Sequence, residues 1–117
     1  MRVNRSTCEH YNWGDGCEGW ILLPGEGLMI IEERMPPDTR EVRHFHSKSR
    51  QFFYVLSGQL QIELEGANYL ISTAEGIEVP PLARHQVMNV SDRDARFLVC
   101  SSPTTRGDRT DCNGENT

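Results

Sequence analysis

Residues 59–65 constrain the fold more than any other stretch of this chain, because they alternate strictly between polar and apolar side chains. Leu60, Ile62 and Leu64 would face a core, whereas the glutamine and glutamate residues between them would face solvent. A period of two predicts a half-buried strand and does not fit a helix. Comparable short segments recur between turns rich in glycine, proline and aspartate. They cover residues 20–23, 28–33, 41–46, 51–56, 69–72, 77–79, 84–90 and 96–101.

About eight or nine short strands at this spacing predict an all-β sandwich or barrel, since no segment has the periodicity of a long helix. The 117 residues suffice for one domain. We expect a glycine-punctuated polar arm over residues 1–19, the barrel over residues 20–102, and a polar tail over residues 103–117. That tail has too few apolar residues to order itself completely. Its Arg106-Gly107-Asp108 tripeptide is interpreted as a chance match to an integrin-type motif.

The charge balance excludes some partners. A formal net charge of −5 argues against nucleic acid, because phosphate binding needs a basic surface. The first twenty residues carry charges throughout and lack the apolar core of a targeting segment. The longest apolar runs, at residues 20–23 and 28–31, are too short to cross a bilayer. We therefore expect a cytoplasmic protein that binds neither a membrane nor nucleic acid.

The four cysteines contain no C-x-x-C pair and are interpreted as free thiols in a reducing compartment. A disulfide between Cys8 and Cys17 is one alternative to this interpretation. A zinc site built from Cys8, His10 and Cys17 is another.

Three of the four histidines fall in two short segments, at His44, His46 and His85. On a strand, residues two apart share one face and lie about 6.6 Å apart. Two imidazoles leaning together from that separation can both reach a metal at about 2.0–2.1 Å. The following residues, rich in aromatic and β-branched side chains, favour a strand. The spacing predicts a metal site, and the alternative is a set of hydrogen-bonded histidines in a metal-free barrel.

Two motifs in this chain resemble those of the cupin superfamily, over roughly residues 20–102. The first motif places His-x-His, a glutamate and a glycine where this chain has His44, His46, Gln51 and Gly58. The second places a proline, a histidine and an asparagine at Pro80, His85 and Asn89. Three motif glycines are replaced, by Asp38, Ala74 and Leu82. The likeness is to small single-domain bacterial cupins.

This resemblance implies a double-stranded β-helix, the jelly-roll barrel of cupins, and commonly a homodimer. It also implies one divalent transition metal inside the barrel, held here by His44, His46, Gln51 and His85. Imidazole-rich ligation suits zinc, iron, nickel or copper and does not decide between them. Gln51 could alternatively point at His85 without touching the metal.

Gln51 is the departure from the family pattern that matters for chemistry. A glutamine offers a neutral carbonyl oxygen where a glutamate would offer a negative charge. The charge of the ion would stay uncompensated, so metal binding should be weaker than in the glutamate form. A small, partly apolar anionic ligand, such as a carboxylate or an enolate, should then be attracted more strongly. Gln51 also cannot act as a general base.

Strand parity predicts which side chains line the ligand pocket. Phe53 and Val55 would share the face of Gln51, Val87 and Asn89 would share the face of His85, and Val42 would lie beside the histidine pair. Two classes of function remain open. One is a metal-dependent enzyme, dioxygenase- or isomerase-like, that acts on a small organic molecule. The other is a non-enzymatic barrel that binds or senses such a molecule, and no catalytic residue is assigned in either case.

Overall fold

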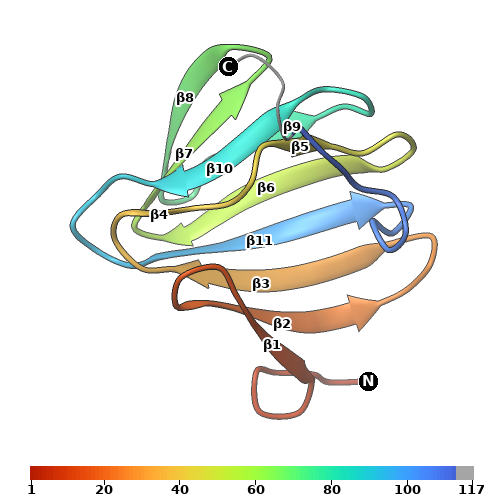
Figure 1. Ribbon diagram of the computed structural model, residues 1–117. Coiled ribbons are helices and arrows are strands. Elements are labelled where there is room, and N and C mark those ends of the chain that lie inside the picture. Colours follow the sequence, from red (N-terminus) through yellow and green to blue (C-terminus); the bar gives the residue numbers. More distant parts are fainter. Residues whose placement is uncertain (113–117) are drawn as a thin grey trace.

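Two antiparallel sheets face each other in the computed structural model, which describes residues 1–112 (Figure 1). The first sheet has the order β1 (Glu9–Trp13), β2 (Cys17–Pro24), β3 (Met29–Met35), β11 (Ala95–Ser102), β6 (Arg50–Ser57) and β9 (Gly76–Val79). The second has the order β12 (Thr110–Asp111), β5 (His44–Phe45), β10 (His85–Asn89), β7 (Gln59–Leu64) and β8 (Ala67–Ser72), and β4 (Thr39–Arg40) pairs with β10.

The all-β architecture predicted from the sequence is confirmed, since the described residues form twelve strands and no helix. Residues 1–112 accordingly contain no helix that could span a bilayer. The cytoplasmic location expected from the sequence stays a prediction.

Alternation of buried and exposed residues in β6 and β11 produces the interior of the barrel. Val55 and Phe53 of β6 lie opposite Phe97 and Val99 of β11, and all four side chains are buried. The intervening side chains of β6, such as Phe52, face outward. Strand parity therefore acts as predicted and sends one face of each strand into a single apolar core.

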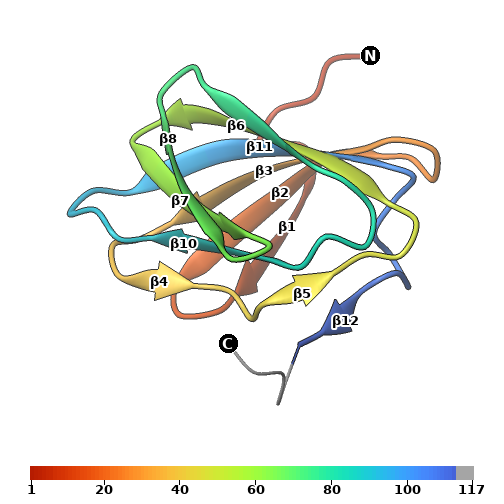
Figure 2. The ribbon, with the colours of Figure 1, turned by 90° about the horizontal axis from the view of Figure 1, so that it is seen from above.

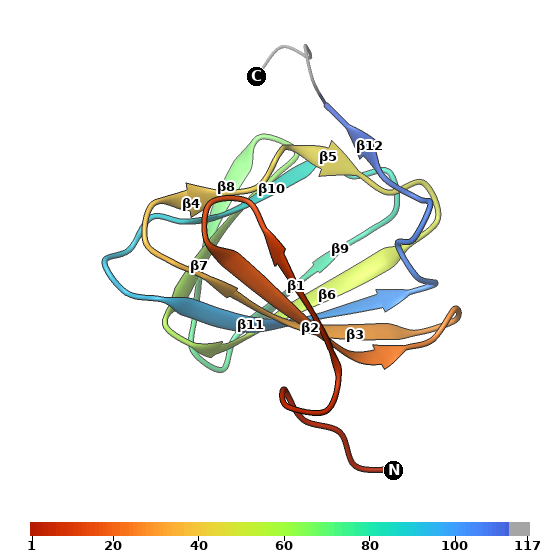
Figure 3. The same cartoon turned by 60° about the horizontal axis from the view of Figure 1, so that its bottom comes forward.

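From Glu9 onward, the segment expected as an arm pairs within the first sheet. β1 and the first part of β2 form a hairpin in which Glu9–Trp13 pair with Ile21–Cys17, and β1 is the edge strand of the first sheet, beside β2 in Figure 3. The boundary expected at residue 19 thus falls inside β2. None of the β1 side chains is fully buried, so the strand carries little apolar periodicity that a sequence pattern could reveal.

Part of the expected tail also belongs to the barrel. Thr110 and Asp111 form β12, which pairs with Phe45 and His44 of β5 at the edge of the second sheet (Figure 2). The expectation of disorder at the very end of the chain concerns residues 113–117, which lie outside the described residues.

Of the strand expected over residues 41–46, only His44–Phe45 (β5) forms, and residues 41–43 separate it from β4. Glu41 explains the interruption, because its N–H donates to Val87 O and its carboxylate accepts a hydrogen bond from Val87 N. A side chain thereby occupies a position that a backbone carbonyl would take in a continuous ladder. Val42, in the gap, is 47% exposed and does not share the buried face of His44.

Three turns keep a left-handed backbone without glycine. Asp38, Ala74 and Leu82 have φ angles of 59°, 67° and 71°. These are the positions at which the cupin motifs place glycine. The turns therefore retain the conformation that glycine adopts most easily, at a cost in backbone strain.

Candidate metal centre

The three motif histidines meet inside the barrel. His44 of β5 lies directly opposite His85 of β10, and their ring centroids are 4.4 Å apart. His46 follows two residues later, with its ring centroid 4.8 Å from that of His44. The ligand nitrogens of the three buried rings all lie within 4.8 Å of one another. We refer to these histidines together with Gln51 as the histidine cluster.

Each ring is oriented by a backbone carbonyl. The Nδ1 atoms of His44, His46 and His85 lie 2.8, 2.6 and 3.0 Å from the carbonyl oxygens of Val42, Asp108 and Ala83. A carbonyl only accepts hydrogen bonds, so each Nδ1 carries the proton and donates it. The lone pair of each neutral ring is consequently on Nε2. This is the arrangement by which partners beyond the metal orient histidine ligands in metal sites.

Three acceptor atoms in the cluster have no hydrogen-bond partner although they are buried: His46 Nε2, His85 Nε2 and Gln51 Oε1. The amide nitrogen of Gln51 donates to Ser101 Oγ at 3.1 Å, and its oxygen accepts no hydrogen bond. An unsatisfied buried polar atom costs about 1–3 kcal/mol, so such atoms rarely gather without a ligand. A divalent cation would satisfy all three, and the donor set therefore fits a metal.

Burial keeps the histidines neutral. It lowers the pKa of His44 to about 3 and that of His85 to about 4, and it also lowers the pKa of His46. The neighbouring His85 lowers the pKa of His44 further, because two adjacent rings cannot both be charged cheaply. At neutral pH the three lone pairs are therefore available to a cation.

Asp108 ties the segment before β12 to the loop that follows His46. Its Oδ1 accepts a hydrogen bond from Ser47 N at 2.7 Å. Its Oδ2 accepts hydrogen bonds from Lys48 N and Ser49 N at 3.0 and 2.9 Å. Desolvation raises the pKa of Asp108, but these three backbone N–H groups outweigh it, so the pKa is lowered. A residue interpreted from sequence as part of a chance motif thus supports His46.

A cavity of about 240 Å³ opens beside the histidine cluster. Most of its polar lining comes from residues that the sequence did not single out. The lining residues are Tyr11, Trp13, Ile31, Glu33, Glu41, His44, His46, Gln51, Phe53, Val99, Ser101, Thr105 and Arg109.

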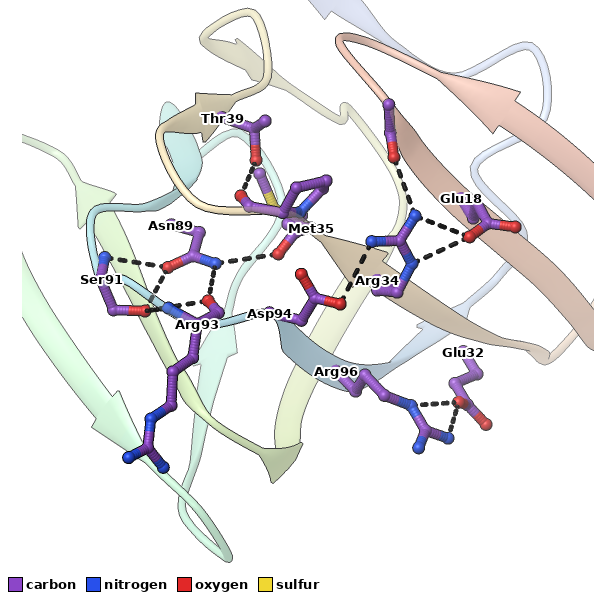
Figure 4. Close-up of polar contacts among 12 residues, drawn as sticks. Glu18, Glu32, Arg34, Met35, Thr39, Asn89, Ser91, Arg93, Asp94 and Arg96 are labelled. Carbon is purple, nitrogen blue, oxygen red and sulfur yellow. Dashed lines mark hydrogen bonds and ion pairs between the residues drawn. The ribbon is translucent and has the colours of Figure 1, made fainter.

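Among the side chains expected to line the pocket, Phe53 does line this cavity. Val55 and Val87 share the inner faces predicted for them but lie in the packed core, and Val42 faces solvent. Asn89 is buried elsewhere, where its amide donates to Met35 O at 2.8 Å and to Arg93 O at 2.7 Å (Figure 4). Strand parity predicts on which face of a strand a side chain lies, but it does not predict how far the cavity extends along the barrel.

Tyr11, Glu33 and Glu41 form a second group in the cavity, which we call the acidic cluster. Burial raises the pKa of Glu33 to about 7, although the hydrogen bond from Tyr11 opposes this shift. Burial and the nearby Glu33 raise the pKa of Glu41 to about 8. The Tyr11 hydroxyl donates to Glu33 Oε2 at 2.7 Å, and burial followed by this carboxylate raises its pKa strongly. Glu41 Oε2 lies 3.7 Å from His44 Nδ1, so the two clusters adjoin.

One signal in the sequence could have revealed Glu33. It lies two residues after Ile31 in an apolar strand, and both line the cavity. A carboxyl on the inner face of a strand is unusual unless it has a role. Tyr11 and Arg109 come from the ends of the chain and had no comparable signal.

No disulfide joins Cys8 to Cys17, and Cys8, Cys17 and Cys100 are free thiols, as expected. Within residues 1–112, the histidines at positions 44, 46 and 85 form the one group of three or more ligands close enough to hold a metal. The alternative zinc site at Cys8, His10 and Cys17 is therefore absent from the described residues.

Solved structures with low sequence identity share this fold. An RmlC-like cupin from Shewanella frigidimarina superposes with a TM-score of 0.80 at 18% identity, covering 90% of this chain and 92% of that one. The polyketide cyclase RemF from Streptomyces resistomycificus superposes with a TM-score of 0.77 at 20% identity, covering 89% of this chain and 76% of that one. The double-stranded β-helix expected from the sequence is thereby confirmed.

Curated relatives share more sequence over a shorter span. Polyketide synthase CurC from Streptomyces cyaneus is 35% identical over 69 residues, which are 59% of this chain and 45% of CurC. Protein SchB from Streptomyces halstedii is 30% identical over 67 residues, which are 57% of this chain and 49% of SchB. The chain thus spans about half the length of these relatives. The family model described as a cupin domain matches residues 31–101, more than half of the chain, and this protein therefore belongs to the cupin domain family.

Proposed function

We propose that this cupin is a metal-dependent enzyme that acts on a small, enolisable carbonyl compound of the polyketide type. The observation that carries the proposal is the convergence of three histidines, with buried and unpartnered atoms at His46 Nε2, His85 Nε2 and Gln51 Oε1, beside a cavity that also holds carboxyl groups. Ligand atoms alone would suit a binding site. Carboxyls with raised pKa values next to them suit proton transfer near neutral pH.

Two comparisons support the substrate class. The curated relative CurC is named a polyketide synthase, and the solved structure RemF is named a polyketide cyclase. Polyketide chains carry β-dicarbonyl units, whose enolates offer two oxygens to one cation. A cavity of about 240 Å³ is smaller than a typical pocket for a drug-sized ligand, about 300–1,000 Å³. We therefore expect it to hold one dicarbonyl unit or one ring, with any longer chain extending outside.

The charges around the cavity favour a ligand that is an enolate or becomes one. The ligand set of three histidines and Gln51 brings no negative charge to a divalent cation, so an anionic oxygen would complete it. Arg109 lines the same cavity and adds positive charge. Glu33 and Glu41 would oppose an anion only when ionised, and burial keeps their pKa values near 7 and 8.

Different residues would bind the metal, support its ligands and exclude water. The three histidines and Gln51 would hold the cation, and Asp108 keeps His46 and its loop in place. A divalent cation held there would supply Lewis acidity toward a carbonyl oxygen. Phe53, Ile31 and Val99 exclude water from part of the lining, which strengthens electrostatic interactions inside.

A thermal-shift experiment with matched ketones tests this function. Acetylacetone has two carbonyls placed to form a chelating enolate, whereas methyl propyl ketone has the same carbon chain and one carbonyl. We expect acetylacetone to stabilise the zinc-loaded protein and not the chelator-treated protein, with zinc content measured afterwards. Equal stabilisation by the two ketones, or stabilisation that survives metal removal, contradicts the proposal and favours the non-enzymatic binding barrel.

We also infer that two copies of the chain associate through the outer face of the first sheet. Phe52 and Leu28 expose large apolar side chains there, with exposed fractions of 44% for each. They line one shallow depression together with Cys100. An apolar surface of this kind is commonly covered by a partner, and a symmetric pair would cover both copies. Light scattering at micromolar concentration should give the mass of a dimer, and Phe52→Glu should give that of a monomer.

A further inference from the structure

Three residues lie in a row across the edge of the first sheet. Tyr11 of β1 is the partner of Gly19 in β2, and Gly19 is the partner of Glu33 in β3. The Tyr11 hydroxyl nevertheless reaches past the middle strand and donates a hydrogen bond to Glu33 Oε2 at 2.7 Å. The tyrosine side chain therefore crosses the strand between it and the carboxyl.

Gly19 makes this crossing possible. A Cβ atom at position 19 would lie 2.1 Å from Tyr11 Cζ and 2.4 Å from its hydroxyl oxygen, distances that real contacts do not reach. Glycine in the interior of a strand weakens the strand, and it often marks a close approach by another group. Here the approaching group is the ring that holds Glu33. The arrangement needs a specific residue on each of three strands.

Tyr11 and Glu33 both line the cavity beside the histidine cluster. We propose that Glu33 is the proton-transfer group of this cavity and that Tyr11, lying across Gly19, is the residue that positions its carboxyl. The inference rests on the proposed function and adds the group that would move the proton.

The proton step balances without a further reactant. The Glu33 carboxylate takes the hydrogen from the carbon between two carbonyls, so that a C–H bond breaks and an O–H bond forms on Glu33. The electron pair of the broken bond passes into the carbonyl system, and an enolate results. Return of the proton to carbon or oxygen restores the carboxylate. A group that performs both directions needs a pKa near the working pH, and that of Glu33 is raised to about 7.

Several charged or titratable groups face Glu33. Burial raises its pKa, whereas the Tyr11 hydrogen bond and the positive charge of Arg109 lower it. Glu41 lines the same cavity, and the charge of Glu33 raises the pKa of Glu41. His44 Nδ1 lies 3.7 Å from the Glu41 carboxylate. Among these groups, Tyr11 is the one hydrogen-bonded to Glu33, so its removal isolates the positioning role.

Hydrogen exchange of methylacetylacetone tests the assignment. This β-diketone has a single hydrogen on its central carbon, and NMR follows the replacement of that hydrogen by deuterium in heavy water. Glu33→Gln in the zinc-loaded protein should reduce the protein-dependent exchange rate about 100-fold, the usual scale of general base catalysis. Its zinc content and its stabilisation by the diketone should stay at wild-type values. Glu26→Gln, the same change on an exposed carboxyl outside the cavity, should leave the rate unchanged.

The pH dependence of exchange tests the positioning role of Tyr11 separately. Tyr11→Phe removes a hydrogen bond that favours the carboxylate, so the pKa of Glu33 should rise and the half-maximal exchange rate should move to higher pH. Gly19→Ala should shift the profile in the same direction, because its Cβ displaces the ring. Carboxyl-carbon NMR of the metal-free protein should show the same rise in the pKa of Glu33, independently of catalysis. A purely structural role for Tyr11 would lower stability without moving either value.

The outcomes separate this inference from the proposed function. If wild-type protein shows metal-dependent stabilisation by the diketone, but exchange does not depend on Glu33, the inference is overturned and the proposed function stands. If Tyr11→Phe leaves the pKa of Glu33 unchanged or lowers it, the positioning role is overturned. If the zinc-loaded wild-type protein is not stabilised at all, the proposed function fails and this inference fails with it.

Discussion

The histidine cluster and the acidic cluster share one cavity, but their polar atoms are satisfied in different ways. In the histidine cluster every Nδ1 donates to a backbone carbonyl, while His46 Nε2, His85 Nε2 and Gln51 Oε1 have no partner. In the acidic cluster the Tyr11 hydroxyl donates a hydrogen bond to the Glu33 carboxyl, and the Glu41 carboxylate accepts a hydrogen bond from Val87 N.

This difference separates two kinds of chemistry. Neutral acceptors without partners are suited to a cation, because a cation satisfies them all without adding a proton. Partnered carboxyls with raised pKa values are suited to holding and releasing a proton near neutral pH. One set of residues would therefore hold the metal and the other would move protons.

The largest expected effect is the loss of metal when a histidine is removed. Replacing His44 or His85 by Ala should abolish stoichiometric metal, because each supplies one of three converging ligand nitrogens. Metal analysis of the purified variants measures this directly, and His10→Ala, outside the cluster, is the matched control. Full metal content in either variant would show that the cluster is not the metal site.

The two clusters should also give the metal-free protein opposite pH dependences. Glu33 and Glu41 have folded-state pKa values raised from 4.5 to about 7 and 8. Their contribution to the free energy of unfolding is therefore present below pH 4.5 and is lost as pH rises through those values. His44 and His85 have folded-state pKa values lowered from 6.5 to about 3 and 4. Their contribution to the free energy of unfolding is therefore lost as pH falls below 6.5.

Denaturant titrations across pH would measure both arms of this profile. The double variant Glu33→Gln, Glu41→Gln should lose most of the fall in unfolding free energy on the alkaline side. We expect that fall to be about 2–4 kcal/mol after allowing for water in the cavity. An unchanged alkaline arm in the double variant would mean that other groups cause it.

Asp108 connects the chain end to the histidine cluster, and its removal should weaken that cluster selectively. Asp108→Ala deletes the acceptor of three backbone hydrogen bonds in the loop after His46. Metal affinity should fall about 10–100-fold, the range seen when groups that orient ligands are lost. Competition with a chromogenic chelator measures the affinity. Asp92→Ala, in an exposed turn, should bind metal like the wild type, and equal losses in both variants would indicate general destabilisation.

Gln51→Glu should tighten metal binding by about tenfold, because it adds a negative charge where the ion lacks one. Ser101 can keep the hydrogen bond by donating its hydroxyl proton to the new carboxylate. The same competition assay applies, with Gln61→Glu as a variant that adds the charge outside the cavity. An affinity equal to that of wild type would place Gln51 outside the ligand set.

The smallest expected effect concerns the turn that supports the histidine cluster. Leu82 has a φ of 71°, is 59% exposed, and donates its N–H to His46 O at 2.7 Å. Leu82→Gly should stabilise the protein by about 0.5–1 kcal/mol, since glycine adopts this conformation without strain. Leu70→Gly, at a similarly exposed position in extended β8, should destabilise it. Thermal unfolding measures this effect, and destabilisation by Leu82→Gly would contradict the interpretation that the backbone at Leu82 is strained.

Strand parity explains which parts of the site could be read from sequence. The spacing of His44, His46 and His85 predicted a shared metal site, and Gln51 was expected beside them from the resemblance to cupins, because it stands where their first motif has a glutamate. Phe53 was also placed on the correct face. Val55 and Val87 lie on the same inner faces but deeper, in the packed core. A pattern with a period of two contains no information about depth along a barrel.

The sequence by itself determined the all-β class, the inward faces of the central strands and the glutamine that stands where the cupin motif has a glutamate, because each depends on residue type and short-range spacing. Only the tertiary structure decided that the two ends of the chain complete the site. Tyr11 and Asp108 act through partners 22 and 62 positions away, and neither lies in an apolar pattern. Such contacts form when the sheets pack against each other, so no local sequence pattern can predict them.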